Sequence, residues 1–566
     1  MTSTDAQGPD EPLVTGSILE VAAMGAAAAA VAAHVPELVR DQVAGAISRQ
    51  DGTLWGQAAQ AEASIRLSWV GLAESSRDLP PRIEALRQEL AAEGVDRVVL
   101  AGMGGSSLAP EVITGTVGVP LVVLDSTDPE QVRSALAAGL DRTVLVVSSK
   151  SGGTLETDSQ RRAFEKALRD AGIDPARRIV VVTDPGSPLE KIAADEGYRA
   201  VFSADPHVGG RYSALTAFGL VPSGLAGADV VRLLDEAADV ADLLSADAEG
   251  NPALVLGAAL AGTVPLRDKI VFADEGSGIV GFADWAEQLI AESTGKEGKG
   301  LLPVVSEGPD APEVTTRPED VLVVRLVSQT AAVHDLVGDD GALAEPAAAG
   351  EGVTVAGSLG AQFLLWEYAV AVAGRLLGIN PFDQPDVESA KAAARGLLDK
   401  QPEPTPPDLV DGVVEIRATP GLLGDAGTLD DAVSALLGTV GPQGYLAVMA
   451  YLDRVHHGSL AGVRAPLARR LARPVTFGWG PRFLHSTGQY HKGGPATGSY
   501  LQITADSPQD LPVPGRPFTF GQLIAAQAAG DAQVLAEHGR PVLRLHLRDR
   551  AEGLRRLEQA LGTPTS

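Results

Sequence analysis

The sequence contains no cysteine among its 566 residues. This absence excludes disulfide bonds, thiolate nucleophiles and metal sites built on cysteine. It is compatible with a cytoplasmic protein, which is the location we expect.

Basic residues are scarce relative to acidic ones. The chain has 45 Lys+Arg and 73 Asp+Glu, so its formal net charge is −28. Such a surface repels nucleic acid and anionic membranes, and we predict neither as a partner. It would also repel a sugar phosphate, so a site for one requires a local concentration of lysine and arginine.

Long uninterrupted apolar runs are missing as well. The stretch 360–378 contains Glu367 and Arg375. We predict a buried helix there, because a bilayer span needs about 20 apolar residues in a row. The alanine-rich run 22–33 has no Lys or Arg before it, and the first is Arg40. Secretory signals begin with positive charge, so this run is predicted to be a helix of the folded protein.

The length, the hydrophobic content of 45% and the mean hydropathy of +0.09 indicate a globular protein of several domains. Apolar strands alternate with helical stretches. Strands are predicted at 97–101, 120–124, 143–147 and 178–183, and again at 269–273, 321–326 and 352–355. This spacing predicts an α/β fold with two doubly wound parallel-sheet domains, followed by a C-terminal α/β block.

Five segments are predicted along the chain. They are a helical lead-in (1–64), a first sheet domain (65–248), a second (249–401), a Pro-rich linker (402–408) and a C-terminal region (409–566). The linker is assigned because it lacks a hydrophobic pattern. Strands of the C-terminal region are predicted near 413–416, 500–505 and 542–547.

The segment VSSKSGGTLET at 147–157 follows an apolar strand, and a helix is predicted to start at Thr154. Unpaired backbone N–H groups and the helix dipole favour an anion at such a helix start. Ser149, Ser151 and Thr154 add hydroxyl groups, and Lys150 adds positive charge. Taken alone, the segment fits an ordinary Ser/Gly loop between a strand and a helix equally well.

A second strand–turn–helix segment carries GMGGSS at 102–107, which is not the dinucleotide-binding G-x-G-x-x-G. The two hydroxyl-rich loops lie about fifty residues apart. Ligands of doubly wound sheets bind at the carboxyl ends of strands, so the pair predicts one sugar phosphate held between two strand ends.

Two charged residues are candidates for chemistry. Arg211 stands in the Gly-flanked turn GGRYS, where its planar guanidinium could bind an enediolate or simply pair with a carboxylate. Glu292 lies near the end of a predicted helix, before a Gly/Lys turn. It is a candidate base if a pocket desolvates it, and otherwise a solvated acidic residue.

The segment FDQPDVESAK places Gln384 and Lys391 seven residues apart, which is two helical turns. They therefore share one helix face and could present an amide and an ammonium to one ligand. A solvated lysine is the alternative.

The Gly-rich loop 480–495 contains His485, His491 and Lys492. Loops with so many special residues commonly carry function. Two histidines six residues apart, without a third ligand nearby, form a weak metal site, and no metal is predicted.

Together, GMGGSS, SSKSGGTLET, GGRYS, ESTGK and FDQPDVESAK resemble glucose-6-phosphate isomerase, in this order, over about residues 65–400. The C-terminal region resembles the isomerase half of bacterial proteins that fuse transaldolase to phosphoglucose isomerase. We expect no transaldolase half, because too little chain precedes residue 65 for a barrel of about 250 residues.

The resemblance implies two sugar-isomerase (SIS) domains, a homodimer, no cofactor, and isomerisation of glucose 6-phosphate and fructose 6-phosphate through an enediolate. It implies substrate contacts for Gly105, Ser106, Ser149, Lys150, Ser151, Thr154 and Gln384.

The same resemblance makes Glu292 the proton-shuttling base, Arg211 the group that stabilises the enediolate, and Lys391 a helper in ring opening. The family also places a ring-opening histidine, normally from the neighbouring subunit, between the base and the lysine. Only His334 lies there, in a context that does not match. The candidates are therefore His334, His485 or His491, or Lys391 alone; the C-terminal loop with His485 and His491 is favoured.

Two other functions stay open. The phosphate loops would equally suit a non-catalytic SIS-domain sensor of phosphosugars, although such a sensor needs no base. A dual glucose/mannose-6-phosphate isomerase would differ only in the shape of the pocket around the second carbon of the sugar.

Overall fold

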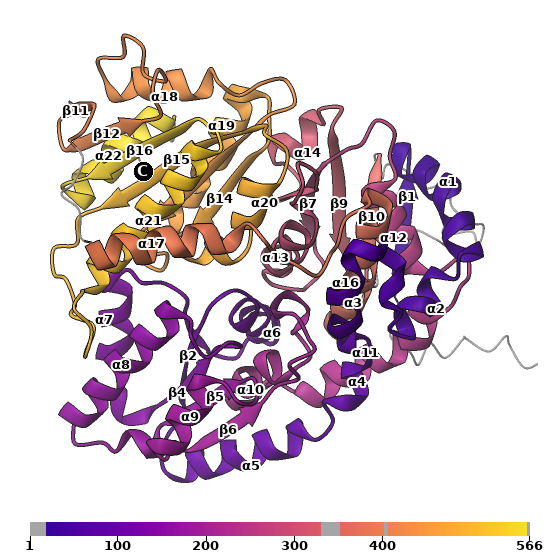
Figure 1. Ribbon diagram of the computed structural model, residues 1–566, viewed down its shortest axis with the longest axis horizontal. Helices are drawn as coiled ribbons and strands as arrows, with labels where there is room; N and C mark the ends of the chain where they lie inside the picture. The colour runs from indigo at the N-terminus through magenta and orange to yellow at the C-terminus, as the bar shows by residue number, and fades with distance from the viewer. Residues whose placement is uncertain (1–18, 330–350, 401–405, 563–566) are drawn as a thin grey trace, which may run out of the picture.

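The computed structural model describes residues 19–329, 351–400 and 406–562. Figure 1 shows three α/β units, each built on its own sheet, with the C-terminal unit in orange and yellow beside the first unit in purple. The prediction of an α/β fold with two doubly wound sheet domains and a C-terminal α/β block is confirmed. The domain boundaries themselves stay a prediction, and His334 lies outside the described residues.

The first sheet is fully parallel, with strand order β3-β2-β4-β5-β6. Its strands are β2 (Arg97–Gly102), β3 (Val122–Leu124), β4 (Thr143–Ser148), β5 (Ile179–Thr183) and β6 (Ala200–Ser203). Strands β4 and β5 are buried along their whole length, as their continuous apolar sequences require. Helices α6 (Leu108–Val117), α8 (Leu155–Asp170), α9 (Pro188–Asp195) and α10 (Ala217–Ala226) belong to this unit.

The second sheet has the order β1-β10-β9-β7-β8. Its parallel strands are β7 (Lys269–Glu275), β8 (Leu302–Val305), β9 (Val321–Val327) and β10 (Gly352–Ala356), with helices α12 (Pro252–Ala261), α13 (Phe282–Thr294) and α16 (Leu359–Leu377). Strand β1 (Glu20–Met24) pairs antiparallel with β10. The predicted helix at 22–33 is therefore wrong at its start, because α1 (Ala26–Arg40) begins only after this strand.

The third sheet has the order β11-β12-β16-β15-β13-β14. Strands β13 (Tyr445–Tyr451), β14 (Val475–Trp479), β15 (Gly498–Ala505) and β16 (Val542–Leu547) are parallel. Strand β12 (Val414–Ala418) pairs antiparallel with both β16 and β11 (Leu409–Asp411). Helices α20 (Gly488–Gly493), α21 (Phe520–Glu537) and α22 (Arg550–Leu561) accompany it.

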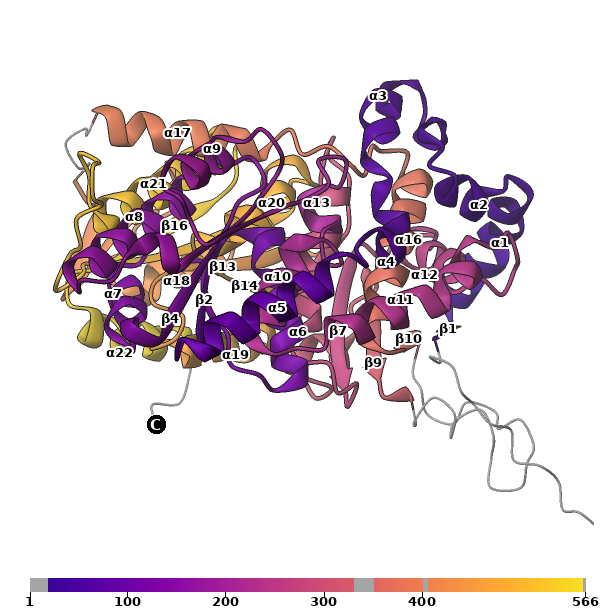
Figure 2. The same cartoon turned by 90° about the horizontal axis from the view of Figure 1, so that it is seen from below.

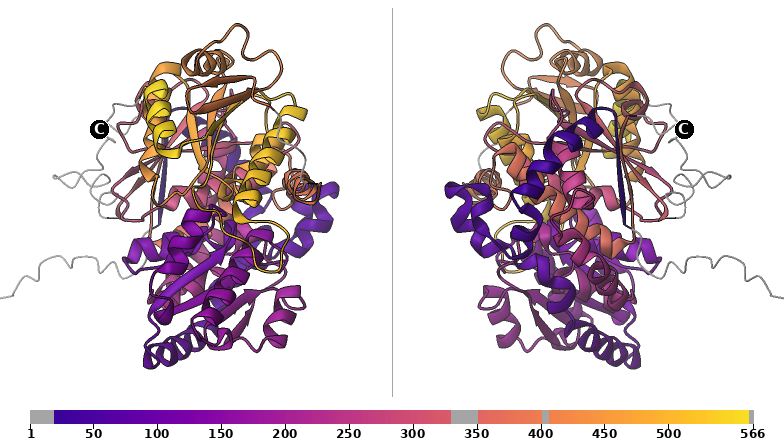
Figure 3. Two further views of the ribbon diagram at one scale, coloured as in Figure 1. Left: turned by 90° about the vertical axis from the view of Figure 1, so that its left-hand side faces the viewer. Right: turned by 90° about the vertical axis from the view of Figure 1, so that its right-hand side faces the viewer.

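The C-terminal unit shares apolar cores with both other units. Val271 and Leu302 of the second sheet pack in one cluster with Met449 and Tyr490. Residues of the first sheet pack in another with Phe520 and Leu523 of α21. Figure 2 and Figure 3 show the three units pressed together, with α17 (Val387–Lys400) lying along α21. In the part of the chain that the structure describes, no helix meets the length and hydropathy of a membrane span.

Candidate active site

A cavity of about 760 Å³ lies where the three units meet. Its walls come from the carboxyl ends of β2 and β4, from α13, from α17 and from the C-terminal loop before α20. Most of the predicted site residues line it. They are Gly105, Ser106, Ser149, Lys150, Ser151, Thr154, Glu292, Gln384, Lys391 and His485.

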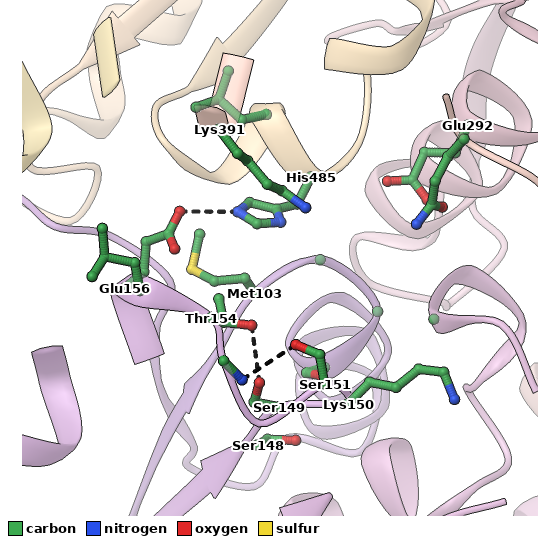
Figure 4. Close-up of a pocket in the computed structure, with 18 of the residues that line it drawn as sticks. Met103, Ser148, Ser149, Lys150, Ser151, Thr154, Glu156, Glu292, Lys391 and His485 are labelled. Atoms are coloured by element: carbon green, nitrogen blue, oxygen red, sulfur yellow. Dashed lines mark hydrogen bonds and ion pairs between the residues drawn. The ribbon is translucent and has the colours of Figure 1, made fainter. Parts of the chain in front are cut away.

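The loop after β4 forms one end of the cavity (Figure 4). Thr154 is the N-cap of α8, as predicted, and its hydroxyl lies 2.9 Å from that of Ser149. Gly152 has φ +66° and packs closely on the backbone of Leu189, so the tight turn depends on glycine. The hydroxyl groups and the start of α8 together make a surface that suits an anion.

Lys150 is less free than the sequence suggested. Its Nζ lies 2.6 Å from Asp184 Oδ2 and 3.2 Å from the carbonyl oxygen of Pro206. Burial raises the pKa of Asp184 above its ordinary value, although the hydrogen bond and charge of Lys150 act to lower it. A phosphate at this loop would therefore share Lys150 with a carboxylate.

The GMGGSS loop packs directly on the turn that carries Arg211. A Cβ on Gly105 would lie 1.9 Å from the carbonyl oxygen of Gly210. No side chain fits between the two segments, so glycine at 105 fixes the distance between the first sugar loop and the arginine turn.

Glu292 and Arg211 form a buried pair. Arg211 Nη1 lies 3.5 Å from Glu292 Oε2, and Arg211 Nε donates to Ser293 Oγ at 2.8 Å. Burial raises the pKa of Glu292, while the charge of Arg211 and a hydrogen bond from Gln288 limit the rise. A desolvated carboxylate beside a cation is suited to take up and return a proton.

Arg211 itself does not line the cavity wall, but it holds a residue that does. Its Nη1 donates to Gln384 Oε1 at 2.6 Å, and its Nη2 donates to the carbonyl oxygens of Pro381 and Asp383. Arg211 thus bridges Glu292 and the segment that leads into α17. Lys391, which lies on α17, points into the cavity (Figure 4).

His485 enters the cavity from the C-terminal unit (Figure 4). Its Nε2 lies 3.1 Å from Glu156 Oε1, which also accepts a hydrogen bond from Gln527 Nε2 at 2.7 Å. Burial acts to raise the pKa of Glu156, but the hydrogen bond and charge of His485, together with Lys391, hold it below the ordinary value. The Glu156 carboxylate therefore stays charged and orients the imidazole.

His491 is placed elsewhere. It is buried among the rings of Tyr445, Phe483 and Tyr500, and it does not line the cavity. Burial and the charges of Lys492 and Arg540 hold its pKa well below the ordinary value. The structure thus brings His485, and not His491, to the cavity.

Positive charge is concentrated around the cavity, as a sugar-phosphate site in so acidic a chain requires. Five basic side chains line the cavity against three carboxylates, although acidic residues dominate the chain. The basic ones are Arg66, Lys150, Lys391, Arg395 and Lys492; the acidic ones are Glu156, Asp184 and Glu292. The cavity wall is therefore richer in positive charge than the rest of the protein.

Several lining residues were missed from the sequence. Glu156 lies within the SSKSGGTLET motif, two positions after the N-cap of α8, where an acidic side chain faces the same space. Gln288 precedes Glu292 by one helical turn, which was a usable signal for a shared face. Gln527 comes from the C-terminal unit, and no local pattern links it to the cavity, whereas Lys492 belongs to the Gly-rich loop that the sequence analysis singled out.

With this geometry established, comparisons with known proteins decide the family. The sequence profile of phosphoglucose isomerase matches residues 77–297. A glucose-6-phosphate isomerase from Rubrobacter xylanophilus is 32% identical over 363 residues, covering 54% of this chain and 83% of that protein. The chain belongs to the phosphoglucose isomerase family.

Other members of the family match over a smaller share of their own length. A glucose-6-phosphate isomerase from Synechococcus elongatus is 30% identical over 349 residues, which is 54% of this chain and 66% of that protein. The chain thus spans slightly less than two thirds of that relative. A crystal structure of a hypothetical protein from Thermus thermophilus is similar in fold, with a TM-score of 0.53 and 26% identity. The match covers 67% of this chain and 100% of the Thermus thermophilus chain.

The family profile ends before the lysine and histidine of the cavity. Residue 297 precedes Gln384, Lys391 and His485, so the matched region contains the two phosphate-side loops, Arg211 and Glu292.

Proposed function

We propose that this protein catalyses the reversible isomerisation of glucose 6-phosphate and fructose 6-phosphate. The observation that carries the proposal is the buried Glu292 carboxylate, with its raised pKa, beside Arg211 in a cavity whose other end is lined by hydroxyl groups and a helix start. A phosphosugar sensor would need the anion-binding loop but not a desolvated base.

In the proposed reaction the loop of Ser149, Ser151 and Thr154 binds the phosphate. His485 and Lys391 assist the opening of the sugar ring by moving a proton between the ring oxygen and the anomeric hydroxyl. Because Glu156 accepts at Nε2 of His485, the other ring nitrogen is left to the substrate.

Glu292 then takes the proton from C2 of the open-chain aldose, and the electron pair forms the enediolate. The same carboxyl returns the proton to C1 while the hydroxyl proton of O2 passes to O1, which gives the ketose. Arg211 lies behind the cavity wall, next to Glu292, and its positive charge stabilises the negative charge that develops on the oxygens. Every proton removed is returned, so no redox partner enters the balance.

The test is conversion of fructose 6-phosphate to glucose 6-phosphate by purified protein without added metal. Glu292→Gln should lower kcat by at least about 10²-fold and leave the binding of fructose 6-phosphate largely intact. Glu297→Gln, at an exposed position in the following loop, is the matched control and should behave as wild type.

The result separates the two readings of the cavity. Turnover in wild type and in Glu297→Gln, but not in Glu292→Gln, supports the isomerase and its base. Binding of fructose 6-phosphate without turnover in any of the three proteins would favour the sensor. Mannose 6-phosphate, offered as a second substrate, tests the dual-specificity alternative.

A homodimer and a cytoplasmic location belong to the same proposal, and both rest on the resemblance to the family. Sedimentation of the purified protein tests the first, and fractionation of the source cells tests the second.

A further inference from the structure

The C-terminal unit forms a wall of the cavity. Leu484, His485, Lys492 and Gln527 line it, although all four lie more than 90 residues after Lys391, the last described motif residue of the second unit. Without this wall, the described part of the cavity lining would lack its only histidine and its only buried lysine, Lys492. These residues line the same cavity as Glu292 and Lys391 of their own chain.

The loop that carries His485 is fixed against the first two units. Gln288 Nε2 donates to the carbonyl oxygen of His485 at 2.8 Å. A Cβ on Gly104 would lie 2.9 Å from that same oxygen, so the GMGGSS loop and the histidine loop are in close contact. The histidine backbone is therefore positioned by the helix that carries the base.

Helix α20, just after His485, is fixed in the same way. Gln489 Nε2 donates to the carbonyl oxygen of Gly295 at 2.9 Å, and Gln489 Oε1 accepts from the backbone N–H of Asp386 at 3.0 Å. Gly298 donates to the carbonyl oxygen of Gly493 at 2.8 Å. Helix α20 thus spans the turn after the base and the segment that leads to Lys391.

The histidine side chain is held by Glu156 of the first unit, which is itself held by a glutamine of the C-terminal unit. Glu156 of α8 accepts from His485, and Gln527 of α21 donates to Glu156. Gln527 in turn accepts from Thr127 Oγ1 at 2.7 Å. Lys492 is likewise supported within the C-terminal unit, because its Nζ lies 2.6 Å from the buried carboxylate of Asp531.

We propose that residues 409–566 complete the active site of their own chain, so that His485 acts beside Glu292 and Lys391 of the same chain. The proposal rests on the proposed isomerase function. It assigns the C-terminal unit a direct part in catalysis through His485, and it holds for a monomer and for a dimer alike.

The experiment is complementation between two inactive variants. Glu292→Gln and His485→Gln are given different affinity tags and co-expressed in one cell. One preparation is the whole mixture, and a second is purified through both tags in turn so that it contains only hybrids. Thermal melting of each variant confirms that it folds. If base and histidine act within one chain, no pairing of these two variants contains both groups in one site.

We expect the co-expressed mixture to show no more activity than the two variants measured separately. Suppose instead that the histidine came from the partner in a dimer. Random pairing of the two variants would then give hybrids in half of the dimers, and each hybrid would have one of its two sites intact. Recovery of about a quarter of wild-type activity would then overturn the proposal. If the active wild type is a monomer, no hybrid can form, and this result also supports the proposal.

A second measurement does not depend on the variants folding. The specific activity of wild type should stay constant on dilution through the concentration at which any dimer dissociates, and a loss that follows dissociation would contradict the proposal. Turnover by His485→Gln at the same rate as by wild type would also contradict the proposal. Absence of wild-type turnover would instead refute the proposed isomerase, so the two failures are distinguishable.

Discussion

At the scale of single residues, the character of Glu292 depends on what surrounds it. The sequence could equally make it a solvated acid at a helix end. In the fold it is buried, which raises its pKa, while Arg211 and Gln288 limit the rise. Its proposed use as a base therefore depends on segments that meet in the fold, and not on the ESTGK motif alone.

The pH dependence of turnover follows from this environment. A base works only when deprotonated, so a raised pKa of Glu292 means that activity is lost at a higher pH as the solution is acidified. The acidic limb of kcat/KM should therefore lie above the ordinary glutamate pKa of 4.5.

Gln288→Met removes a hydrogen bond that favours the charged form of Glu292. The acidic limb should then move further toward neutral pH, by a few tenths of a unit, since the bond is long at 3.5 Å. Profiles of kcat/KM against pH for both proteins measure this, and a limb that moves to lower pH would contradict the assignment of the base.

At the scale of elements, two buried cations hold the segment that leads into α17. Lys296 Nζ donates to the carbonyl oxygens of Asn380 and Asp383, at 2.7 and 2.6 Å. Arg211 donates to the neighbouring carbonyls of Pro381 and Asp383. Burial lowers the pKa of Lys296 to about 8. The ESTGK motif therefore positions the Gln384 segment as well as carrying the base.

Replacing this lysine should loosen the segment. Lys296→Met leaves the carbonyl oxygen of Asn380 without this donor, and leaves that of Asp383 with Arg211 alone, at a cost of about 1–3 kcal/mol in the free energy of unfolding. We expect a lower melting temperature and a kcat/KM reduced by about tenfold, because Gln384 and Lys391 move relative to Glu292.

The matched control is Lys299→Met. Lys299 lies in the same turn and donates to the carbonyl oxygen of Leu377 at 3.1 Å, but its side chain is exposed. It should leave kcat/KM unchanged. Equal losses in the two variants would show that the turn, and not the buried lysine, sets the geometry.

At the scale of the whole molecule, arginines of the C-terminal unit pair with carboxylates of the other two units. Arg473 makes two hydrogen bonds to Asp320, at 2.8 and 2.6 Å. Arg454 and Arg482 each pair with both Glu111 and Asp125 of the first unit. Together with the shared apolar cores, these contacts fix the wall that carries His485.

This ionic contact predicts how stability depends on pH. Burial acts to raise the pKa of Glu111, but Arg482 and Arg454 lower it to about 2. A carboxyl with a lowered pKa contributes stability fully above its ordinary pKa of 4.5, and loses that contribution as the pH falls toward 2. Protonation should therefore weaken the attachment of the C-terminal unit in this window.

Glu111→Gln should lower the melting temperature at neutral pH, and its difference from wild type should shrink between about pH 4.5 and pH 2. Glu84→Gln, which removes an exposed carboxylate paired with Arg87 on the surface of α5 (Leu79–Ala92), is the control and should have little effect. A Glu111→Gln difference that stays constant over the whole range would refute the assigned linkage.

The sequence by itself determined the α/β class, the strands that begin near residues 97, 143, 269 and 321, and the two hydroxyl-rich loops. These features depend on contacts between residues close in the chain: continuous apolar strands, glycine turns and helix starts. Strands β1, β6, β8, β11, β13 and β14 were not predicted. Strand β1, for example, is stabilised by pairing with β10, which lies far along the chain.

Only the tertiary structure decided which side chains share the cavity. His485 and Glu156 are 329 residues apart, and Arg211 and Gln384 are 173 apart. Their meeting depends on how three sheets pack, through apolar cores and ion pairs that no short pattern encodes. The same packing buries His491 and exposes His485 to the cavity, although both stand in one loop of the sequence.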